Sequence, residues 1–320
     1  MTLFYFDEQC VTHDMGRGHP ECPARLQSVY DAVATALPQR EHKTPTPAPF
    51  DALIRAHSER HVQQLFDLRP GAELVAIDGD TLFGPGTLQA ARLATGALLD
   101  ATTEVLAQSD NPAFCCVRPP GHHAERDQAM GFCFFNSVAV AALSALETRG
   151  LSRVAILDFD VHHANGTEDI FRDDPRVLLC SSYQHPLYPY TNTPSVPGQR
   201  VNVPLAAGTG SDAFRQAILD TWLPALEAFR PQLILVSAGF DAHQDDPLGG
   251  LCLRDDDYHW LGLRIGEWAA RWSAGRVVAA LEGGYDLAAL GRSAAMFCYG
   301  LDGGSQGLPT TASTEPTASG

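Results

Sequence analysis

A short segment near the middle of the sequence carries three side chains that can bind a metal ion. Asp158, Asp160 and His162 stand at alternate positions at the end of an apolar run that begins at Val154. A continuous apolar run followed by turn residues is typical of a buried parallel strand. Side chains two positions apart on a strand share a face, so we expect these three to project together. Carboxylates and an imidazole in one place are natural ligands for a divalent metal.

A second apolar run, residues 233–240, ends in Asp241 and offers a third ligand. The carboxyl ends of parallel strands meet at one edge of a sheet, where open α/β proteins place their sites. An ion pair or a helix cap would explain any one of these residues alone. Together, two carboxylates and one imidazole leave a coordination position free, as in a catalytic zinc site. The pattern predicts hydrolysis, in which the metal activates water and polarises a carbonyl.

Two further segments offer groups for proton transfer and oxyanion binding. His122 and His123 follow a Pro-Pro-Gly turn that comes after the apolar run 113–117. Adjacent imidazoles can act as base and acid, because histidine titrates near neutral pH. Tyr285 follows the apolar run 277–281 and two glycines, and its hydroxyl can donate a hydrogen bond to an oxyanion. Taken singly, the histidines would suit a surface loop and the tyrosine a packing role.

In their order along the chain, these segments resemble the histone deacetylase superfamily, and most closely its class II and bacterial deacetylase-like branches. The resemblance runs from residue 19 to residue 285 and so covers nearly the whole sequence. Each motif is moderately specific, and their shared order makes the resemblance very specific. The matching segments are 19–26, 78–81 with 85–88, 118–125, 131–136, 158–167, 237–243 with 246–250, and 282–285.

The resemblance implies a zinc-dependent mechanism with a role for each matching residue. His123 would be the general base that takes a proton from the attacking water and then protonates the leaving amine, with His122 as its electrostatic partner. Tyr285 would polarise the amide carbonyl and stabilise the tetrahedral intermediate. Ligands of this type also accept ferrous iron. Three residues match the zinc ligands: Asp160, His162 and Asp241.

The resemblance also implies a narrow tunnel for the acyl-lysine chain. Gly131 would offer its backbone carbonyl to the substrate amide, and Phe132 would form one wall. Tyr188 is the candidate for the second wall, in a segment that matches the family only in part. Leu248 stands where a polyamine-specific branch carries an acidic gatekeeper. Leucine has no charge to bind a second ammonium group, which disfavours a dedicated acetylpolyamine enzyme.

Three residues match supporting positions of the family. Asp158 and Ser181 match side-chain ligands of an inner structural potassium site, which backbone carbonyls would complete. Asp158 also fits a residue that orients His122. Asn165 stands where class I relatives carry aspartate, and asparagine is usual in class II-like members. We therefore expect the second histidine to have a neutral orienting partner and a different basicity.

Composition narrows the partners and the compartment. The formal net charge of −16 disfavours direct nucleic-acid binding and favours cationic substrates. No apolar run approaches membrane-spanning length, and the first residues lack a basic signal-peptide region. The eight cysteines show no CxxC spacing and are expected to be reduced thiols. These features predict a cytoplasmic protein without a membrane partner, and they leave its oligomeric state open.

Apolar runs alternate with helical stretches along the sequence. We expect helices over 87–106, 136–146, 212–229 and 257–272, the second capped by Asn136. Strands that alternate with helices imply a mainly parallel sheet covered on both faces. The resemblance adds the α/β arginase-deacetylase fold, with a single eight-stranded mainly parallel sheet flanked by helices on both faces. We predict a catalytic domain over 1–302 and a disordered, Gly-, Ser-, Thr- and Pro-rich tail over 303–320.

The sequence thus predicts a zinc-dependent deacetylase that removes acetyl or related acyl groups from amines. Acetyl-lysine in peptides or proteins is the leading substrate, and a small acylated amine such as an acetylpolyamine is the first alternative. A binding protein that has lost catalysis is another. A further alternative is a binuclear manganese ureohydrolase on the same fold, although the paired histidines and the tyrosine fit one metal better. Its candidate ligands are Asp158, Asp160, His162, Asp241 and Asp245.

Overall fold

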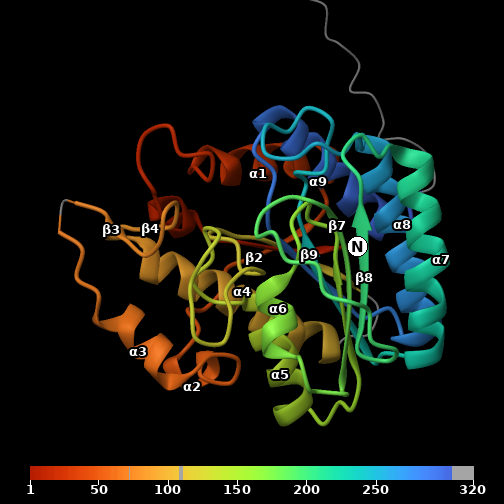
Figure 1. The fold of residues 1–320 in the computed structure, drawn as a ribbon, viewed down its shortest axis with the longest axis horizontal. Coiled ribbons are helices and arrows are strands. Elements are labelled where there is room, and N and C mark those ends of the chain that lie inside the picture. Colours follow the sequence, from red (N-terminus) through yellow and green to blue (C-terminus); the bar gives the residue numbers. More distant parts are fainter. Residues whose placement is uncertain (72, 108–110, 305–320) are drawn as a thin grey trace, which may run out of the picture.

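The centre of the molecule is a parallel β-sheet. The computed structural model describes residues 1–71, 73–107 and 111–304. Within them, eight strands form one sheet in the order β2-β1-β5-β10-β9-β6-β7-β8. Figure 1 shows β7 and β8 of this sheet with helices α7 and α8 to their right. Every pair of neighbouring strands in this sheet is parallel. The prediction of an eight-stranded, mainly parallel sheet is therefore confirmed.

The elements have the following bounds. The strands of the large sheet are β1 (Leu3–Phe6), β2 (Glu41–Lys43), β5 (Ala113–Cys116), β6 (Val154–Asp158), β7 (Val177–Gln184), β8 (Arg200–Leu205), β9 (Leu233–Ala238) and β10 (Val277–Leu281). A separate antiparallel hairpin consists of β3 (Val75–Ala76) and β4 (Leu82–Phe83). The α-helices are α1 (Ala24–Ala36), α2 (Phe50–Leu53), α3 (Glu59–Asp67), α4 (Thr87–Ala107), α5 (Ser137–Thr148), α6 (Asn165–Ile170), α7 (Ser211–Phe229), α8 (Asp255–Trp272) and α9 (Leu287–Leu301), and a 3₁₀ turn covers Glu8–Thr12.

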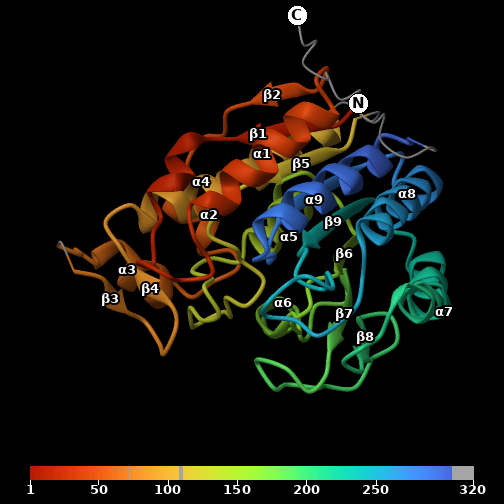
Figure 2. The same cartoon turned by 90° about the horizontal axis from the view of Figure 1, so that it is seen from above.

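Alternation along the central strands divides the interior into two hydrophobic cores. Ala155 and Leu157 of β6 pack in one core with residues of α1, α7, α8 and α9. Val154 and Ile156 of the same strand pack in the other, with α4 and α5. Helices therefore cover both faces of the sheet, which explains why its strands are apolar throughout. In Figure 2, α7, α8 and α9 lie along one side of the strands.

The predicted helices agree with α4, α5, α7 and α8 to within two residues at each end. Asn136 caps α5 as predicted, because its side chain accepts a hydrogen bond from the Ala139 N–H. Within the described part of the chain, no helix is both long enough and apolar enough to cross a membrane. The eight cysteines are all free thiols. Most of the predicted disordered tail, residues 305–320, lies outside the described residues.

Because the strands are parallel, their carboxyl ends lie at one edge of the sheet. Five connections start there and carry the residues of interest. They are residues 117–136 after β5, 159–164 after β6, 185–199 after β7, 239–254 after β9 and 282–286 after β10.

Candidate active site

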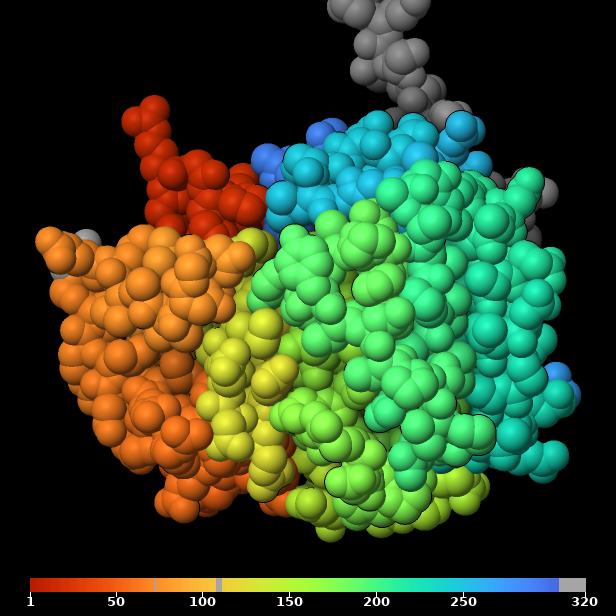
Figure 3. Space-filling model, viewed as in Figure 1, coloured from red at the N-terminus to blue at the C-terminus, as the bar shows by residue number. Residues whose placement is uncertain are grey.

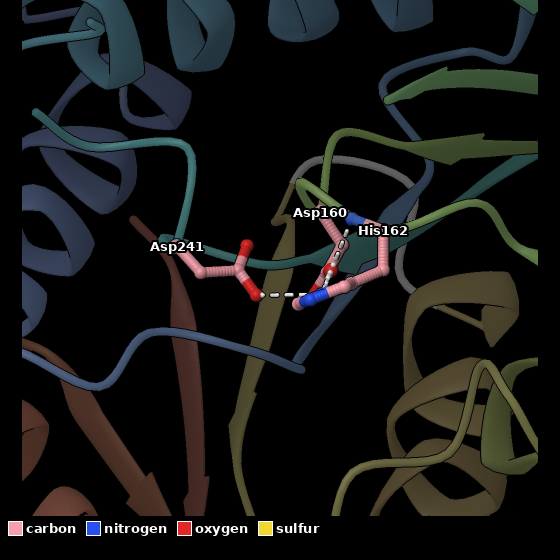
Figure 4. Close-up of side chains that lie close together, drawn as sticks. All are labelled: Asp160, His162 and Asp241. Atoms are coloured by element: carbon pink, nitrogen blue, oxygen red, sulfur yellow. Dashed lines mark hydrogen bonds and ion pairs between the residues drawn. The ribbon is translucent and has the colours of Figure 1, made fainter. Parts of the chain in front are cut away.

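Asp160, His162 and Asp241 form the one potential metal-binding group found among the described residues (Figure 4). All three are buried, and their ligand atoms lie within 4.8 Å of one another. The Nδ1 atom of His162 is 2.9 Å from Asp160 Oδ1 and 3.2 Å from Asp241 Oδ2. The three predicted ligands therefore do meet.

The electrostatics of this group favour a cation. Burial, and then the charge of Asp160, raise the pKa of Asp241 to about 7, because two buried carboxylates so close repel each other. The Oδ2 atom of Asp241 is buried and accepts no hydrogen bond of good geometry from the described residues. A divalent ion would remove the repulsion and give this oxygen a partner. One imidazole and two carboxylates fit zinc or ferrous iron.

Backbone N–H groups of neighbouring loops fix the two carboxylates. Gly283 N–H donates to Asp160 Oδ2 at 2.8 Å, and Val161 N–H donates to Asp241 Oδ1 at 2.8 Å. Position 283 has to be glycine, because a Cβ atom there would clash with the Asp241 carboxylate. The loops after β6, β9 and β10 are thus linked at the metal-binding group.

One expectation about this segment was wrong. The strand β6 ends at Asp158, so Asp160 and His162 belong to a loop and do not continue the strand. Side-chain bonds to the backbone replace the strand ladder here. Asp158 Oδ1 accepts the Asp160 N–H at 3.1 Å, and Asp160 Oδ1 accepts the His162 N–H at 2.9 Å. The other oxygen of Asp158 contacts His122, and Asp158 is not a member of the metal-binding group.

His122 and His123 lie side by side, with ring centroids 4.0 Å apart, but in different electrostatic settings. His122 Nδ1 is 3.0 Å from Asp158 Oδ2, whereas His123 Nδ1 is 2.6 Å from Asn165 Oδ1. Burial opposes the charged form of His122, but the carboxylates of Asp160 and Asp158 outweigh it and raise its pKa well above the usual value. Burial, and then the adjacent imidazoles, lower the pKa of His123 well below it. The pair therefore favours one cationic and one neutral ring.

Tyr285 is held by contacts to its backbone and its ring. Asp246 Oδ2 accepts the Tyr285 N–H at 2.6 Å, and Arg25 Nε donates to the Gly284 carbonyl at 2.6 Å. The Arg25 guanidinium also lies 4.8 Å from the centroid of the Tyr285 ring. Burial raises the pKa of Tyr285 well above its usual value, so its hydroxyl stays protonated and can donate a hydrogen bond.

Four of these side chains, His122, His123, His162 and Tyr285, line a common cavity of about 390 Å³, a size typical of small-molecule sites. The predicted substrate-binding residues Gly131, Phe132, Tyr188 and Leu248 all contribute to its lining. Tyr188 packs edge-on against His123, with ring centroids 5.1 Å apart. The other lining residues are His19, Pro20, Asp80, Pro120, Leu187, Tyr190 and Gly283. On the face shown in Figure 3, the loop after β5 (yellow) borders the loop between β7 and β8 (green).

Asp158 and Ser181, the two predicted potassium ligands, lie on neighbouring strands. The two residues are direct partners in the register of β6 and β7. The hydroxyl of Ser181 is buried and has no hydrogen-bond partner among the described residues. An orphaned buried oxygen beside a buried carboxylate fits a hard, oxygen-seeking cation.

A buried ionic cluster beneath the site had no predicted role, although its residues lie in motifs identified from the sequence. Glu21 Oε1 accepts hydrogen bonds from Arg25 at 2.9 Å and from Arg118 at 2.6 Å. All three side chains are fully buried. Arg25 leads to the Tyr285 turn, and Arg118 begins the segment of the paired histidines. No local pattern pairs Glu21 with Arg118, because 97 positions separate them along the chain.

Glu282 is another residue that sequence reasoning left without a role. Its Oε2 atom accepts the backbone N–H of Gly121 at 2.6 Å and that of His122 at 3.1 Å. Glu282 therefore links the loop after β10 to the loop of the paired histidines.

The binuclear alternative is not supported by the positions of its proposed ligands. The side chain of Asp245 is 51% exposed and lies 3.8 Å from Arg292. It is not part of the metal-binding group, and Asp158 is engaged by His122. Within residues 1–71, 73–107 and 111–304, only one group of metal ligands was found, and it comprises three residues.

Comparison with known proteins finds similarity over most of the chain. Residues 19–301 match the family model described as "Histone deacetylase domain". The chain is 38% identical over 316 residues to a histone deacetylase-like amidohydrolase of Pseudomonas aeruginosa, covering 90% of this chain and 82% of the relative. It is 40% identical over 297 residues to a probable deacetylase of Methanothermobacter thermautotrophicus, covering 89% and 86%. The crystal structure of the HDA15 HD domain superposes with a TM-score of 0.87 at 33% identity, over 95% of this chain and 90% of that one. This likeness confirms the predicted arginase-deacetylase fold.

Proposed function

The chain belongs to the histone deacetylase family, and we propose that it is a zinc-dependent deacetylase. Its reaction would be hydrolysis of the amide between an acetyl or related acyl group and a primary amine. The observation that carries this proposal is the buried group of Asp160, His162 and Asp241. Its member His162 lines the same cavity as two further histidines and a tyrosine. These are the groups that hydrolysis of a poor electrophile needs.

Asp160, His162 and Asp241 would bind the zinc ion, and ferrous iron suits the same ligands. A metal bound there would polarise the amide carbonyl and make water a better nucleophile. We also propose that Asp158 and Ser181 bind a structural potassium ion, as the orphaned Ser181 hydroxyl suggests.

His123 is the proposed general base. Asn165 Nδ2 donates to Glu125 Oε1 at 2.8 Å, so Asn165 Oδ1 faces His123 and accepts a hydrogen bond from Nδ1. The neutral ring therefore carries its proton on Nδ1 and leaves Nε2 as the acceptor. His123 would take the proton of the attacking water at Nε2 and return it to the leaving amine.

Charge that develops on the substrate would be stabilised from two sides. His122, kept cationic by Asp158, would offset the negative charge near the attacking water. Tyr285 would donate a hydrogen bond from its hydroxyl to the carbonyl oxygen as that oxygen becomes anionic. This division of roles does not require a covalent enzyme intermediate.

Acetyl-lysine in a peptide or protein is the proposed substrate. Phe132 and Tyr188 give the cavity aromatic walls that suit an alkyl chain, and Leu248 adds no charge to it. Asp80 lines the same cavity and forms no ion pair with the described residues. Its carboxylate favours cationic groups beside the acylated amine, which also keeps a small acylated polyamine as the second candidate. The free thiols support a cytoplasmic location, which we propose as well.

A mass-spectrometric deacylation panel tests the proposed substrate class. Zinc-loaded protein is compared with Tyr285→Phe on an acetyl-lysine peptide, acetylated polyamines and longer acyl-lysine peptides. Turnover of the peptide that is lost in the variant supports a lysine deacetylase. Turnover of polyamines alone would assign the enzyme to small-molecule metabolism. An absence of turnover on every substrate would contradict catalysis and favour a binding protein.

A further inference from the structure

Phe132, one wall of the cavity, has an unusual backbone conformation. Its φ angle is 68°, and that of the preceding Gly131 is 56°. Positive φ is natural for glycine but strains a residue that carries a bulky side chain. Such a conformation persists only where the surroundings fix it. The contacts of Phe132 should therefore include a group that stabilises this turn.

The turn itself explains only part of the stabilisation. Met130 and Cys133 exchange both backbone hydrogen bonds, at 3.1 Å and 2.9 Å. Gly131 and Phe132 thus occupy the two corners of a tight turn. The N–H of Phe132 is not used in this exchange and needs a partner from elsewhere in the chain.

Thr81 is that partner. Its Oγ1 atom accepts the Phe132 N–H at 3.0 Å, across 51 residues of sequence. The side chain of Thr81 is fully buried. Thr81 lies in the connection between β3 and β4, where Asp78 Oδ1 accepts the backbone N–H of Thr81 at 2.6 Å and that of Asp80 at 3.1 Å. The hydroxyl is therefore presented from a turn that is itself fixed by hydrogen bonds.

The position of the Phe132 ring matters for the cavity. Its centroid lies 6.0 Å from that of Tyr285 and 4.7 Å from that of His19, in edge-on contacts. A rotation of the backbone at Phe132 would move its ring away from Tyr285 and His19. It would widen the space for the alkyl chain without changing the metal-binding group or the paired histidines.

We propose that Thr81 is a positioning residue that sets the shape of the substrate tunnel by fixing Phe132. The inference rests on the proposed function for its link to substrate binding, but the hydrogen bond can be tested without it. The hydroxyl of Thr81, and not its bulk, carries the effect. Its loss should weaken the binding of the alkyl chain while leaving the chemical step intact.

Two matched substitutions separate the hydroxyl from the packing. Thr81→Val keeps the branched shape but cannot accept a hydrogen bond, and Thr81→Ser keeps the hydroxyl. For the acetyl-lysine peptide we expect Thr81→Val to raise KM by about tenfold, the value of one buried hydrogen bond, with kcat within about twofold. Thr81→Ser should retain the KM of the unsubstituted protein. If Thr81→Val instead caused a general loss of structure, kcat would fall as well, and Thr81→Ser would not retain the activity of the unsubstituted protein.

Hydrogen exchange measured by mass spectrometry gives a readout independent of activity. The peptide that contains the Phe132 N–H should exchange faster in Thr81→Val than in either Thr81→Ser or the unsubstituted protein. Equal exchange and equal KM in all three proteins would overturn the inference. If the unsubstituted protein deacetylates nothing, the proposed function fails, and the exchange rates still decide whether Thr81 fixes Phe132.

Discussion

Asn165 Oδ1 lies 2.6 Å from His123 Nδ1, so a neutral amide orients the proposed general base. Its neighbour His122 is paired with a carboxylate, that of Asp158, at 3.0 Å. The two histidines therefore differ in their partners as well as in the direction of their pKa shifts. This asymmetry supports His123 as the proposed proton acceptor and leads to the first prediction.

Asn165→Asp should move the acidic limb of the kcat/KM pH profile upward by about 1–2 pH units. A carboxylate beside His123 stabilises its cation and so raises its pKa. The base must be neutral to accept a proton, so a higher pKa requires a higher pH for full activity. The measurement is kcat/KM against pH for the acetyl-lysine peptide. Because the new carboxylate would face Glu125, Asn165→Asp combined with Glu125→Gln is the control for repulsion. An unchanged limb in both proteins would rule out His123 as the group that titrates.

Tyr285→Phe should lower kcat by about 100- to 1000-fold, the value of one hydrogen-bond donor to an oxyanion. Metal content and melting temperature should change little, because Tyr285 is fixed through its backbone N–H and its ring. Single-turnover rates and bound metal are measured on the same sample. If the variant keeps more than about a third of the rate, the oxyanion must be stabilised by another group.

Asp241→Asn should weaken zinc binding by more than about 100-fold, since even residues outside the metal ligands contribute 10- to 100-fold. Its effect on stability should depend on the metal. Without metal, the variant should melt above the unsubstituted protein, because it removes one of two mutually repelling buried carboxylates. With saturating zinc the order should reverse. Thermal unfolding with and without a chelator checks both, and a variant that is less stable in both states would argue against this repulsion.

His57 should make the protein less stable in mild acid. Burial, and then the charge of His61, lower the pKa of His57 to about 3, and its Nε2 atom accepts the Asn136 N–H at 2.9 Å. The unfolded chain takes up the proton below about pH 6.5 and the folded protein does not, so stability is complete above pH 6.5 and falls as the pH is lowered towards 3.

When the pH is lowered from 7 to 5, protonation of His57 in the unfolded chain should reduce the free energy of unfolding by about 2 kcal/mol. Urea unfolding at the two pH values measures the loss. The His57→Gln variant has no titrating group at this position, so its loss over the same interval should be smaller by that amount. Equal losses in the two proteins would show that His57 is not responsible.

The fold and the metal-binding group could be predicted from the sequence because both follow from local patterns. Apolar runs marked β6, β9 and β10, and the shared edge of parallel strands brought Asp160 and Asp241 together. The end of β6 could not be predicted, since the side chains of Asp158 and Asp160 turn the backbone by bonds that compete with the strand ladder.

Contacts between residues far apart in the sequence could not be predicted from local patterns. Nothing near Thr81 indicates that its hydroxyl accepts an N–H from a residue 51 positions away. The ion pair between Glu21 and Arg118 joins residues 97 positions apart in the sequence. It forms only when the folded sheet brings their segments together. Tyr188 lines the cavity, although the segment around it matches the family motif only in part.

The most direct test is a zinc titration of the metal-free protein, read as release of acetate from an acetyl-lysine peptide. The three ligands Asp160, His162 and Asp241 predict activity that rises linearly and ends at about one zinc ion per chain, as for a mononuclear catalytic site. The fully loaded Tyr285→Phe protein should stay nearly inactive. Activity that requires two ions per chain, or a protein that binds one zinc ion and releases no acetate, would contradict the proposed deacetylase.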